Sequence, residues 1–190
     1  GAIGTPLFAR VFHAVQLPAH LQGWRVNQAD AGGGVVLDIT VHDADTLRFL
    51  LDAEPVEAIA MTPSAGPLAD GVMAVLRFDN GVLAQLHDAF NVPHAGTGIE
   101  IHGSLGSLVG RDVMTERPVG EVRLRTAGGE RVVAVEPHNL YAHSLAAFNR
   151  AVQGQGAPAA TGEDGLRSLA AALAVLEAAR TGGSTSVQKV

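Results

Sequence analysis

The sequence contains no cysteine and only one lysine, Lys189, which is the next-to-last residue. Without cysteine, the chain can form no disulfide, carries no thiolate nucleophile and cannot bind zinc or an iron–sulfur cluster through sulfur. Any nucleophile or metal ligand must therefore be an oxygen or an imidazole nitrogen. A reaction that needs a buried catalytic lysine must obtain it from outside this sequence.

The sequence also lacks an excess of positive charge and a long apolar run. The 13 Lys and Arg residues are outnumbered by 19 Asp and Glu, giving a formal net charge of -6, whereas a nucleic-acid surface needs clustered basic residues. No apolar run reaches the ~18 residues of a membrane-spanning helix, and the start does not resemble a secretion signal. We therefore expect a soluble, cytoplasmic protein that binds neither nucleic acid nor membrane.

Apolar residues make up 47% of the 190 residues, which is enough for the core of one domain spanning the chain. Their spacing predicts an α+β protein with one open sheet and one layer of helices. The expected strands are residues 5–15, 56–62, 71–78, 81–90, 98–103, 104–110, 121–126 and 131–136. The expected helices are residues 32–51, 139–153 and 162–183, and a loop is expected over residues 16–30.

Turn and capping residues separate these elements. Asp79-Asn80-Gly81 is typical of a hairpin turn. Glu163 and Asp164 suit the positive N-terminal end of the last helix. Pro55 is expected to stop the first helix, and Gly182-Gly183 to end the last one.

Each expected helix has a face of apolar residues at helical spacing, and the face of the last helix is expected to be buried. These faces are Leu37, Val41, Ala44, Leu47 and Leu51; then Leu140, Leu145, Phe148 and Val152; then Leu166, Leu169, Leu173 and Leu176. Trp24 and Tyr141 are expected to be packing anchors, although either could stack on a sugar.

Three titratable residues follow one flank of the first helix: Asp38, His42 and Asp45. At ~100° per residue they project from about the same side, offset from the leucines. Such a stripe could be an ordinary solvated face. It could instead be an imidazole held by carboxylates, which would serve as a general acid or base. A metal site of two carboxylates and one histidine is the least favoured alternative, because no second ligand pair accompanies it.

Two other features have both a functional and a structural interpretation. His87 lies in an expected strand and could face the substrate, although a histidine on a sheet face is the commoner case. Gly32 to Gly34 could bind an anion at the start of the helix, but conformational freedom is the simpler explanation.

Five segments, taken in order, resemble the C-terminal domain of the glucose-fructose oxidoreductase, inositol dehydrogenase and rhizopine-catabolism (Gfo/Idh/MocA) family. The segment GGGVVLDITVHDAD is similar to the family's three glycines followed by Asp, His and Asp at fixed spacing. The other four are GAIGTPLFARVF, FDNGVLAQL, GIEIHGSLGSLVG and the ending from FNRAVQ to GGSTSV. Together they cover nearly the whole chain.

The resemblance implies a large, open, mostly antiparallel mixed sheet with helices on one face, as in the C-terminal domain of glyceraldehyde-3-phosphate dehydrogenase. It also implies that this chain is the substrate-binding and oligomerisation half of a two-domain enzyme. The N-terminal Rossmann domain, which binds NAD or NADP and supplies a catalytic lysine, would be absent. The sequence fits this implication, since it has no GxGxxG between a strand and a helix and no suitable lysine.

Matched to the family's pattern, His42 corresponds to the histidine that takes the hydroxyl proton, and Asp38 to the aspartate that orients substrate and lysine. Asp45 matches a common family position, and Thr40 stands where glycine is frequent. The expected substrate is a sugar, cyclitol or related polyol. The expected assembly is a homodimer or homotetramer formed through the sheet face. The alternative is a non-catalytic binding or dimerisation module on the same scaffold.

Overall fold

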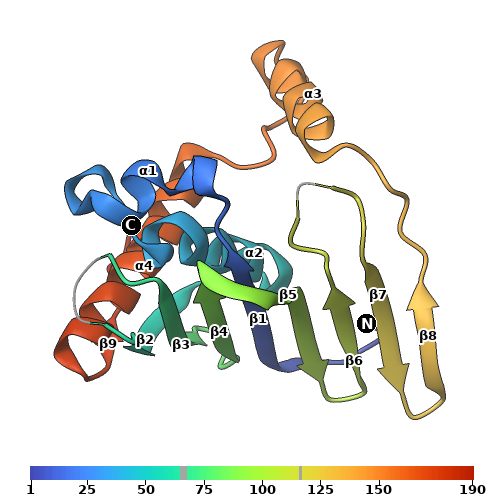
Figure 1. Ribbon diagram of the computed structural model, residues 1–190. Coiled ribbons are helices and arrows are strands. Elements are labelled where there is room, and N and C mark those ends of the chain that lie inside the picture. The colour runs from blue at the N-terminus through green and yellow to red at the C-terminus, as the bar shows by residue number, and fades with distance from the viewer. Residues whose placement is uncertain (65–67, 116) are drawn as a thin grey trace.

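Alternating buried and exposed residues along the chain form one large sheet. The computed structural model describes residues 1–64, 68–115 and 117–190 (Figure 1). Within them, nine strands pair in the order β8-β7-β6-β5-β1-β4-β3-β2-β9. The strands are β1 (Pro6–Gln16), β2 (Pro55–Met61), β3 (Gly71–Phe78), β4 (Leu83–Ala89), β5 (Asn91–Gly103), β6 (Gly106–Arg111), β7 (Glu121–Thr126), β8 (Gly129–Val133) and β9 (Thr185–Ser186).

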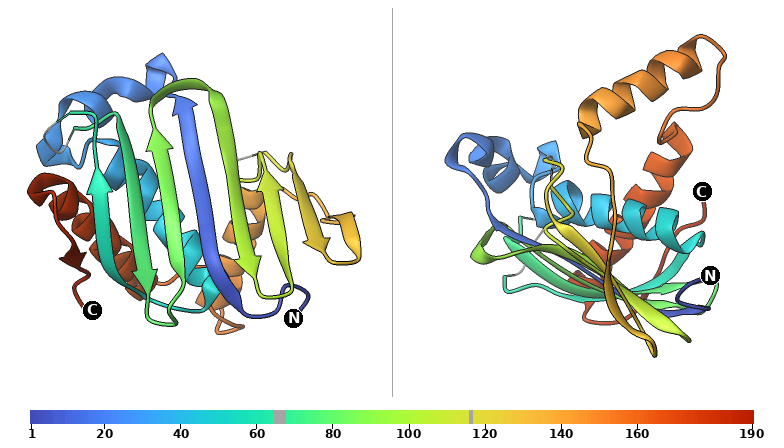
Figure 2. Two further views of the ribbon diagram at one scale, coloured as in Figure 1. Left: turned by 90° about the horizontal axis from the view of Figure 1, so that it is seen from below. Right: turned by 90° about the vertical axis from the view of Figure 1, so that its right-hand side faces the viewer.

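The described pairs are antiparallel except β1 with β4, which run parallel near the centre of the sheet. Helices cover one face, and the other face is open (Figure 2). The expected α+β fold with an open, mostly antiparallel mixed sheet is confirmed. The hairpin between β3 and β4 is also confirmed, since Gly81 adopts a φ of +87° and its N–H bonds to the carbonyl of Phe78.

The segment expected to be a loop contains a helix, so that expectation was wrong. Helix α1 (Ala19–Asn27) follows Pro18, and a 3₁₀ turn, η1 (Ala29–Ala31), comes after it. Gly23 interrupts α1 with φ 19° and ψ −121°, which leaves two short helical pieces. Because helix α1 lies at the surface, its sequence lacks the apolar periodicity by which a helix is recognised. Trp24 is exposed on α1 rather than anchored in the core.

The first expected helix is confirmed, but it begins with a π-helical turn, η2 (Val36–Thr40), that continues into α2 (Val41–Leu51). A π turn holds more residues than an α turn and rotates the following side chains about the axis. Val36 and Ile39 therefore face the core, and Leu37 and Val41 are only partly buried. The helix ends at Asp52, which adopts a left-handed φ of 47°, three residues before Pro55.

Helix α4 (Gly162–Thr181) buries its small residues rather than its leucines, so the predicted face was wrong. A capping box between Thr161 and Asp164 starts the helix, and Gly182 in the left-handed conformation ends it, as expected. Leu166, Leu169 and Leu173 are exposed. The buried side chains are Ser168, Ala170, Ala171, Ala172, Ala174, Val175 and Ala178. Small side chains let the helix lie close against α2 and the sheet, which a leucine stripe would prevent.

Helix α3 (Leu140–Val152) stands away from this helical layer (Figures 1 and 2). Asn139 caps it by accepting from the N–H of Ala142. Its predicted apolar face is exposed, and Tyr141, which was expected to be a packing anchor, is exposed beside it. Ala147 is its buried residue. Helical periodicity found this face correctly but could not tell what covers it.

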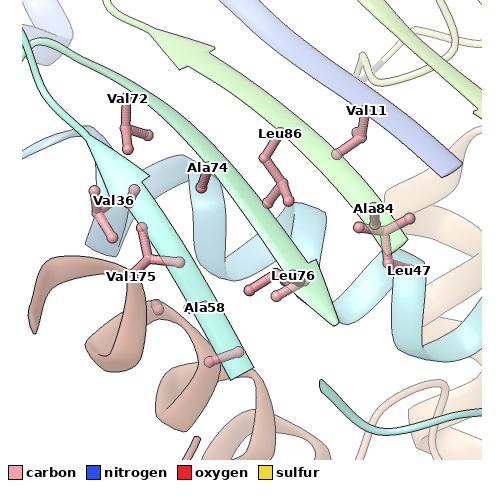
Figure 3. Close-up of a cluster of buried hydrophobic side chains, with 14 of the residues drawn as sticks. Val11, Val36, Leu47, Ala58, Val72, Ala74, Leu76, Ala84, Leu86 and Val175 are labelled. Carbon is pink, nitrogen blue, oxygen red and sulfur yellow. The ribbon is translucent and has the colours of Figure 1, made fainter. Parts of the chain in front are cut away.

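The core lies between the sheet and the helices η2, α2 and α4 (Figure 3). Side chains from β1, β4, β3 and β2 meet side chains from these helices. The labelled members are Val11, Ala58, Val72, Ala74, Leu76, Ala84 and Leu86 from the sheet, with Val36, Leu47 and Val175 from the helices. This packing fixes α2 across β1 and β4, which positions the polar residues described below.

The close approach of α4 gives a stability prediction. Ala171→Leu inserts a larger side chain where there is no exposed surface, and we expect it to lower the free energy of unfolding by about 1–3 kcal/mol. Leu173→Ala, at a residue 49% exposed on the same helix, should change it by less than about 1 kcal/mol. Urea denaturation of both variants tests this, and a larger loss for Leu173→Ala would contradict the assigned face.

Candidate active site

The polar site at the start of α2 is built around an ion pair between Arg25 and Asp38. The Nε of Arg25 lies 3.1 Å from each carboxylate oxygen of Asp38. The guanidinium also lies over the ring of Trp24, with its Cζ 4.5 Å from the ring centroid. Both partners of the ion pair are about one-quarter exposed. They therefore keep polar surface that a ligand can reach.

His13 lies near both Asp38 of this ion pair and a second histidine, His42. His42 is exposed on the first turn of α2. His13 comes from β1, on the helix-covered face beside Asp88 of β4. Burial lowers the pKa of His13; the nearby His42 lowers it further, and Asp38 partly opposes this. His13 is therefore a neutral imidazole at neutral pH, next to an exposed second imidazole.

Beneath the histidines lies a buried pair of carboxyl groups, Asp43 of α2 and Asp88 of β4. Neither residue has exposed surface. The hydroxyl of Thr40 donates to Oδ2 of Asp88 at 2.5 Å. The pKa of Asp43 is raised by burial and then by the charge and hydrogen bond of Asp88, and burial also raises the pKa of Asp88. Two carboxyl groups in contact in such a site share one proton at neutral pH.

This pair reaches the site through His13. The Nδ1 of His13 lies 4.0 Å from Oδ1 of Asp43. Both atoms are buried, and neither has a hydrogen-bond partner among the described residues. Thr40 has a clear structural role here, since a glycine at this position would leave Asp88 without its donor.

The structure does not bring Asp45 together with His42 and Asp38 through any described contact. Its Oδ1 accepts from Ser168 at 2.9 Å and from Arg48 at 3.3 Å. Arg48 also donates twice to Glu54, at 2.7 and 2.8 Å. Asp45 therefore joins α2 to α4. Its expected role in substrate binding stays a prediction that this position does not favour.

His87 points away from the site. It precedes Asp88 on β4, and consecutive side chains of a strand lie on opposite faces. Because Asp88 faces Thr40 under α2, His87 lies on the open face, beside Met73 of β3. The expectation that His87 contacts substrate also stays a prediction, without support from its location in this chain.

The three glycines before the helix serve backbone packing. Gly32 and Gly34 adopt φ values of +80° and +97°. A Cβ on Gly33 would lie 2.8 Å from the carbonyl oxygens of Trp24 and Gln28. The N–H groups of Gly33 and Gly34 bond to the carbonyls of Gln28 and Arg25. The conformational explanation is therefore correct, because these amides are not available to an anion.

Sequence patterns missed His13, Arg25, Asp43 and Asp88. Arg25 lies in the segment that was expected to be a loop, and Asp43 is not on the flank defined by Asp38, His42 and Asp45. One usable signal existed: Ala84, Leu86 and Asp88 alternate along β4, which places a carboxyl on the buried face. Among the described residues, no group of three or more His, Asp or Glu could hold a metal ion, and no helix is long and apolar enough to span a membrane.

Comparison with known proteins agrees with this fold. Residues 1–109 match the model of the GFO/IDH/MocA C-terminal domain, and the chain belongs to this family. It is 57% identical to 1,5-anhydro-D-fructose reductase of Ensifer adhaerens over 99% of this chain and 58% of that protein. It is 28% identical to inositol 2-dehydrogenase of Rhizobium meliloti over 77% of this chain and 48% of that protein. The chain thus spans about half the length of these relatives.

Solved structures share the fold. The aldose-aldose oxidoreductase of Caulobacter crescentus, complexed with glycerol, superposes with a TM-score of 0.86 at 25% identity. The match covers 98% of this chain and 57% of the oxidoreductase chain. A levoglucosan dehydrogenase in complex with NADH and levoglucosan superposes with a TM-score of 0.81 at 24% identity, over 100% of this chain and 60% of its own. The family resemblance seen in the sequence is confirmed.

The buried carboxyl pair predicts a pH-dependent stability. Its folded-state pKa is raised, so the folded chain holds a proton that the unfolded chain releases above about pH 4. The pair therefore stabilises the fold fully at low pH, and this contribution is lost as pH rises toward the folded pKa. Relative to Asp43→Asn, the unfolding free energy of the wild type should fall by up to about 1.4 kcal/mol per pH unit.

Urea denaturation of both proteins between about pH 5 and about pH 8 measures this difference, since the asparagine carries no titrating proton. Asp45→Asn is the matched control, because Asp45 is partly exposed on the same helix. Parallel stability curves for the wild type and Asp43→Asn would show that the pair does not share a proton.

Proposed function

We propose that this chain is the substrate-side half of an NAD(P)-dependent oxidoreductase that interconverts a hydroxyl and a carbonyl group of a sugar, cyclitol or related polyol. One observation carries the proposal. The Arg25–Asp38 ion pair and the exposed His42 lie close to the partly buried His13, and Asp38 and His42 stand at the positions that resemble the family's Asp and His motif. A merely solvated helix face would not need an imidazole and an ion pair from three separate elements.

The chemistry divides between two groups. Oxidation of a secondary alcohol removes a hydride from carbon and a proton from oxygen, and reduction of the ketone returns both. The nicotinamide, when bound, supplies or accepts the hydride. In this chain His42 takes the hydroxyl proton during oxidation and returns it during reduction, because it is the exposed imidazole. Asp38, held by Arg25, orients the substrate hydroxyl beside it.

The substrate class follows from the surroundings and the relatives. Sugars bind through hydrogen bonds to their hydroxyls and through stacking on aromatic rings. Arg25, Asp38 and the exposed Trp24 offer both kinds of contact. Since a relative 57% identical to this chain is named 1,5-anhydro-D-fructose reductase, we take 1,5-anhydro-D-fructose as the first substrate to test, with reduction as the measured direction.

A cofactor-binding half outside this chain completes the site in our proposal. The glycines before α2 have no free amides for a pyrophosphate, and the chain spans 58% of its 57%-identical relative. An uncovered apolar surface supports the same idea. On α3, the exposed large apolar residues are Leu140, Tyr141, Leu145, Phe148 and Val152. We propose that a Rossmann domain binding NAD or NADP covers this helix and supplies the lysine that the chain lacks.

The open face of the sheet is the proposed contact with a second copy of the chain. It carries exposed apolar side chains on β1, β3 and β2, and the helices leave it uncovered (Figure 2). These side chains are Phe8, Ile59, Met61, Met73 and Val75. An apolar patch of this extent is typical of an interface. A homodimer or homotetramer through this face keeps the histidine site, on the other side, accessible.

His42→Ala tests the catalytic role. In the full-length protein we expect kcat for 1,5-anhydro-D-fructose to fall by about 10²–10⁴-fold, because general acid–base catalysis is lost, while NAD(P) binding is kept. His102→Ala is the control, since His102 lies beside Phe8 at the opposite end of β1. An unchanged rate in His42→Ala would remove the proposed role. A protein that binds NAD(P) but turns over no polyol or ketose would favour the non-catalytic alternative.

Met73→Glu tests the assembly. Met73 is 50% exposed on β3, and a charge there should disfavour an apolar interface. We expect multi-angle light scattering of the full-length protein to shift from a dimer or tetramer toward a smaller species, with the circular dichroism spectrum unchanged. Phe49→Glu, on the exposed side of α2, should leave the mass unaltered. A wild-type monomer at high concentration would refute this interface.

A further inference from the structure

The proposed reaction leaves the buried carboxyl pair, Asp43 and Asp88, without a function. Burying charge is costly, and an apolar pair would fill this place between α2 and β4 with less loss. The pair is nevertheless fully enclosed, and its helix member, Asp43, lies in the turn of α2 that carries His42. Its position next to His13 indicates what it does.

The hydrogen-bond donors around the pair decide where its proton lies. Thr40 donates to Oδ2 of Asp88, so Asp88 is the carboxyl group of the pair that acts as a hydrogen-bond acceptor. Asp43 is then the carboxyl group that keeps the shared proton, since burial and the neighbouring Asp88 raise its pKa. The oxygen of Asp43 that faces His13 is left as an acceptor, 4.0 Å from Nδ1. Among the described residues, no other hydrogen-bond partner reaches this buried nitrogen.

We propose that the Asp43–Asp88 pair positions His13: the Asp43 carboxyl accepts the Nδ1–H of His13, so that Nε2 presents its lone pair to a substrate hydroxyl beside His42. A neutral imidazole carries its proton on one nitrogen only, and the partner of one nitrogen sets the role of the other. The contact of 4.0 Å shortens when substrate orders the site. The substrate part of this inference rests on the proposed function, whereas the tautomer of His13 does not.

A carboxyl that holds its own proton is suited to this task. An ionised Asp43 would attract a proton to His13 and create an imidazolium next to His42. The charged or titratable groups near His13 are Asp43 and Asp88 in the buried layer, and Asp38 and His42 nearer the surface. The shared proton keeps His13 neutral, so proton exchange with the substrate is left to His42 alone.

Imidazole ¹⁵N chemical shifts of the full-length protein test the tautomer without any turnover. The His13 signals are assigned by their loss in His13→Gln. In the wild type we expect Nδ1 protonated and Nε2 unprotonated near neutral pH. Asp43→Asn should keep this tautomer, because the amide donates to Asp88 and its oxygen still accepts from His13. Asp43→Leu offers no acceptor, so the population should shift toward Nε2–H.

Asp88→Asn is a second test, and it does not depend on the folding of Asp43→Leu. The new amide donates to Asp43 and removes the opposing charge, so Asp43 ionises and the pKa of His13 should rise. An Nε2–H tautomer in the wild type, or an unchanged His13 pKa in a folded Asp88→Asn protein, would overturn the proposal.

Steady-state kinetics then separate this inference from the proposed function. Asp43→Leu should raise KM about tenfold with a smaller change in kcat, and Asp43→Asn should restore most of the loss. Correct tautomers in a protein without turnover would refute the proposed function and leave the positioning intact. Full activity with an unaltered tautomer in Asp43→Leu would refute the positioning alone.

Discussion

The packing of helix α2 across the two parallel strands β1 and β4 is the constraint on which the site depends. Val36, Leu47 and the sheet residues around Leu86 hold the helix against the sheet (Figure 3). The same contact encloses Thr40 and two carboxyl groups. Burial of these carboxyl groups is costly, and a shared proton and the hydroxyl donor of Thr40 reduce that cost. Stability and site geometry therefore come from one interface between helix and sheet.

The π turn at the start of this helix links the two layers of the site. The extra residue in the π turn places Val36 and Ile39 in the core and leaves Asp38 at the surface with Arg25. π turns inside α-helices are frequent at functional sites, where they redirect side chains without breaking the helix. Beyond the turn, His42 and Asp43 are neighbours in sequence but face outward and inward, so that one helix contributes to both the accessible site and the buried pair.

The two uncovered apolar surfaces have different meanings. The open sheet face spans several strands and lies opposite the histidines, which suits contact with a second copy. Helix α3 stands apart on the helical side, where a cofactor-binding half would meet the site. A domain that exposes both surfaces is suited to a role between two neighbours, since each neighbour would bury apolar area that the chain alone cannot.

The sequence alone determined strands β1 to β8, the hairpin at Gly81, the acidic start of α4 at Asp164 and its end at Gly182, and the Asp38–His42 motif, because these follow from local periodicity and turn chemistry. Only the tertiary structure decided which helix faces are buried, as the exposed leucines of α4 demonstrate, because burial depends on the neighbouring surface rather than on spacing. It also decided that His13, Arg25 and Asp88 meet beside α2. These residues come from separate elements, and no local pattern records the distance between them.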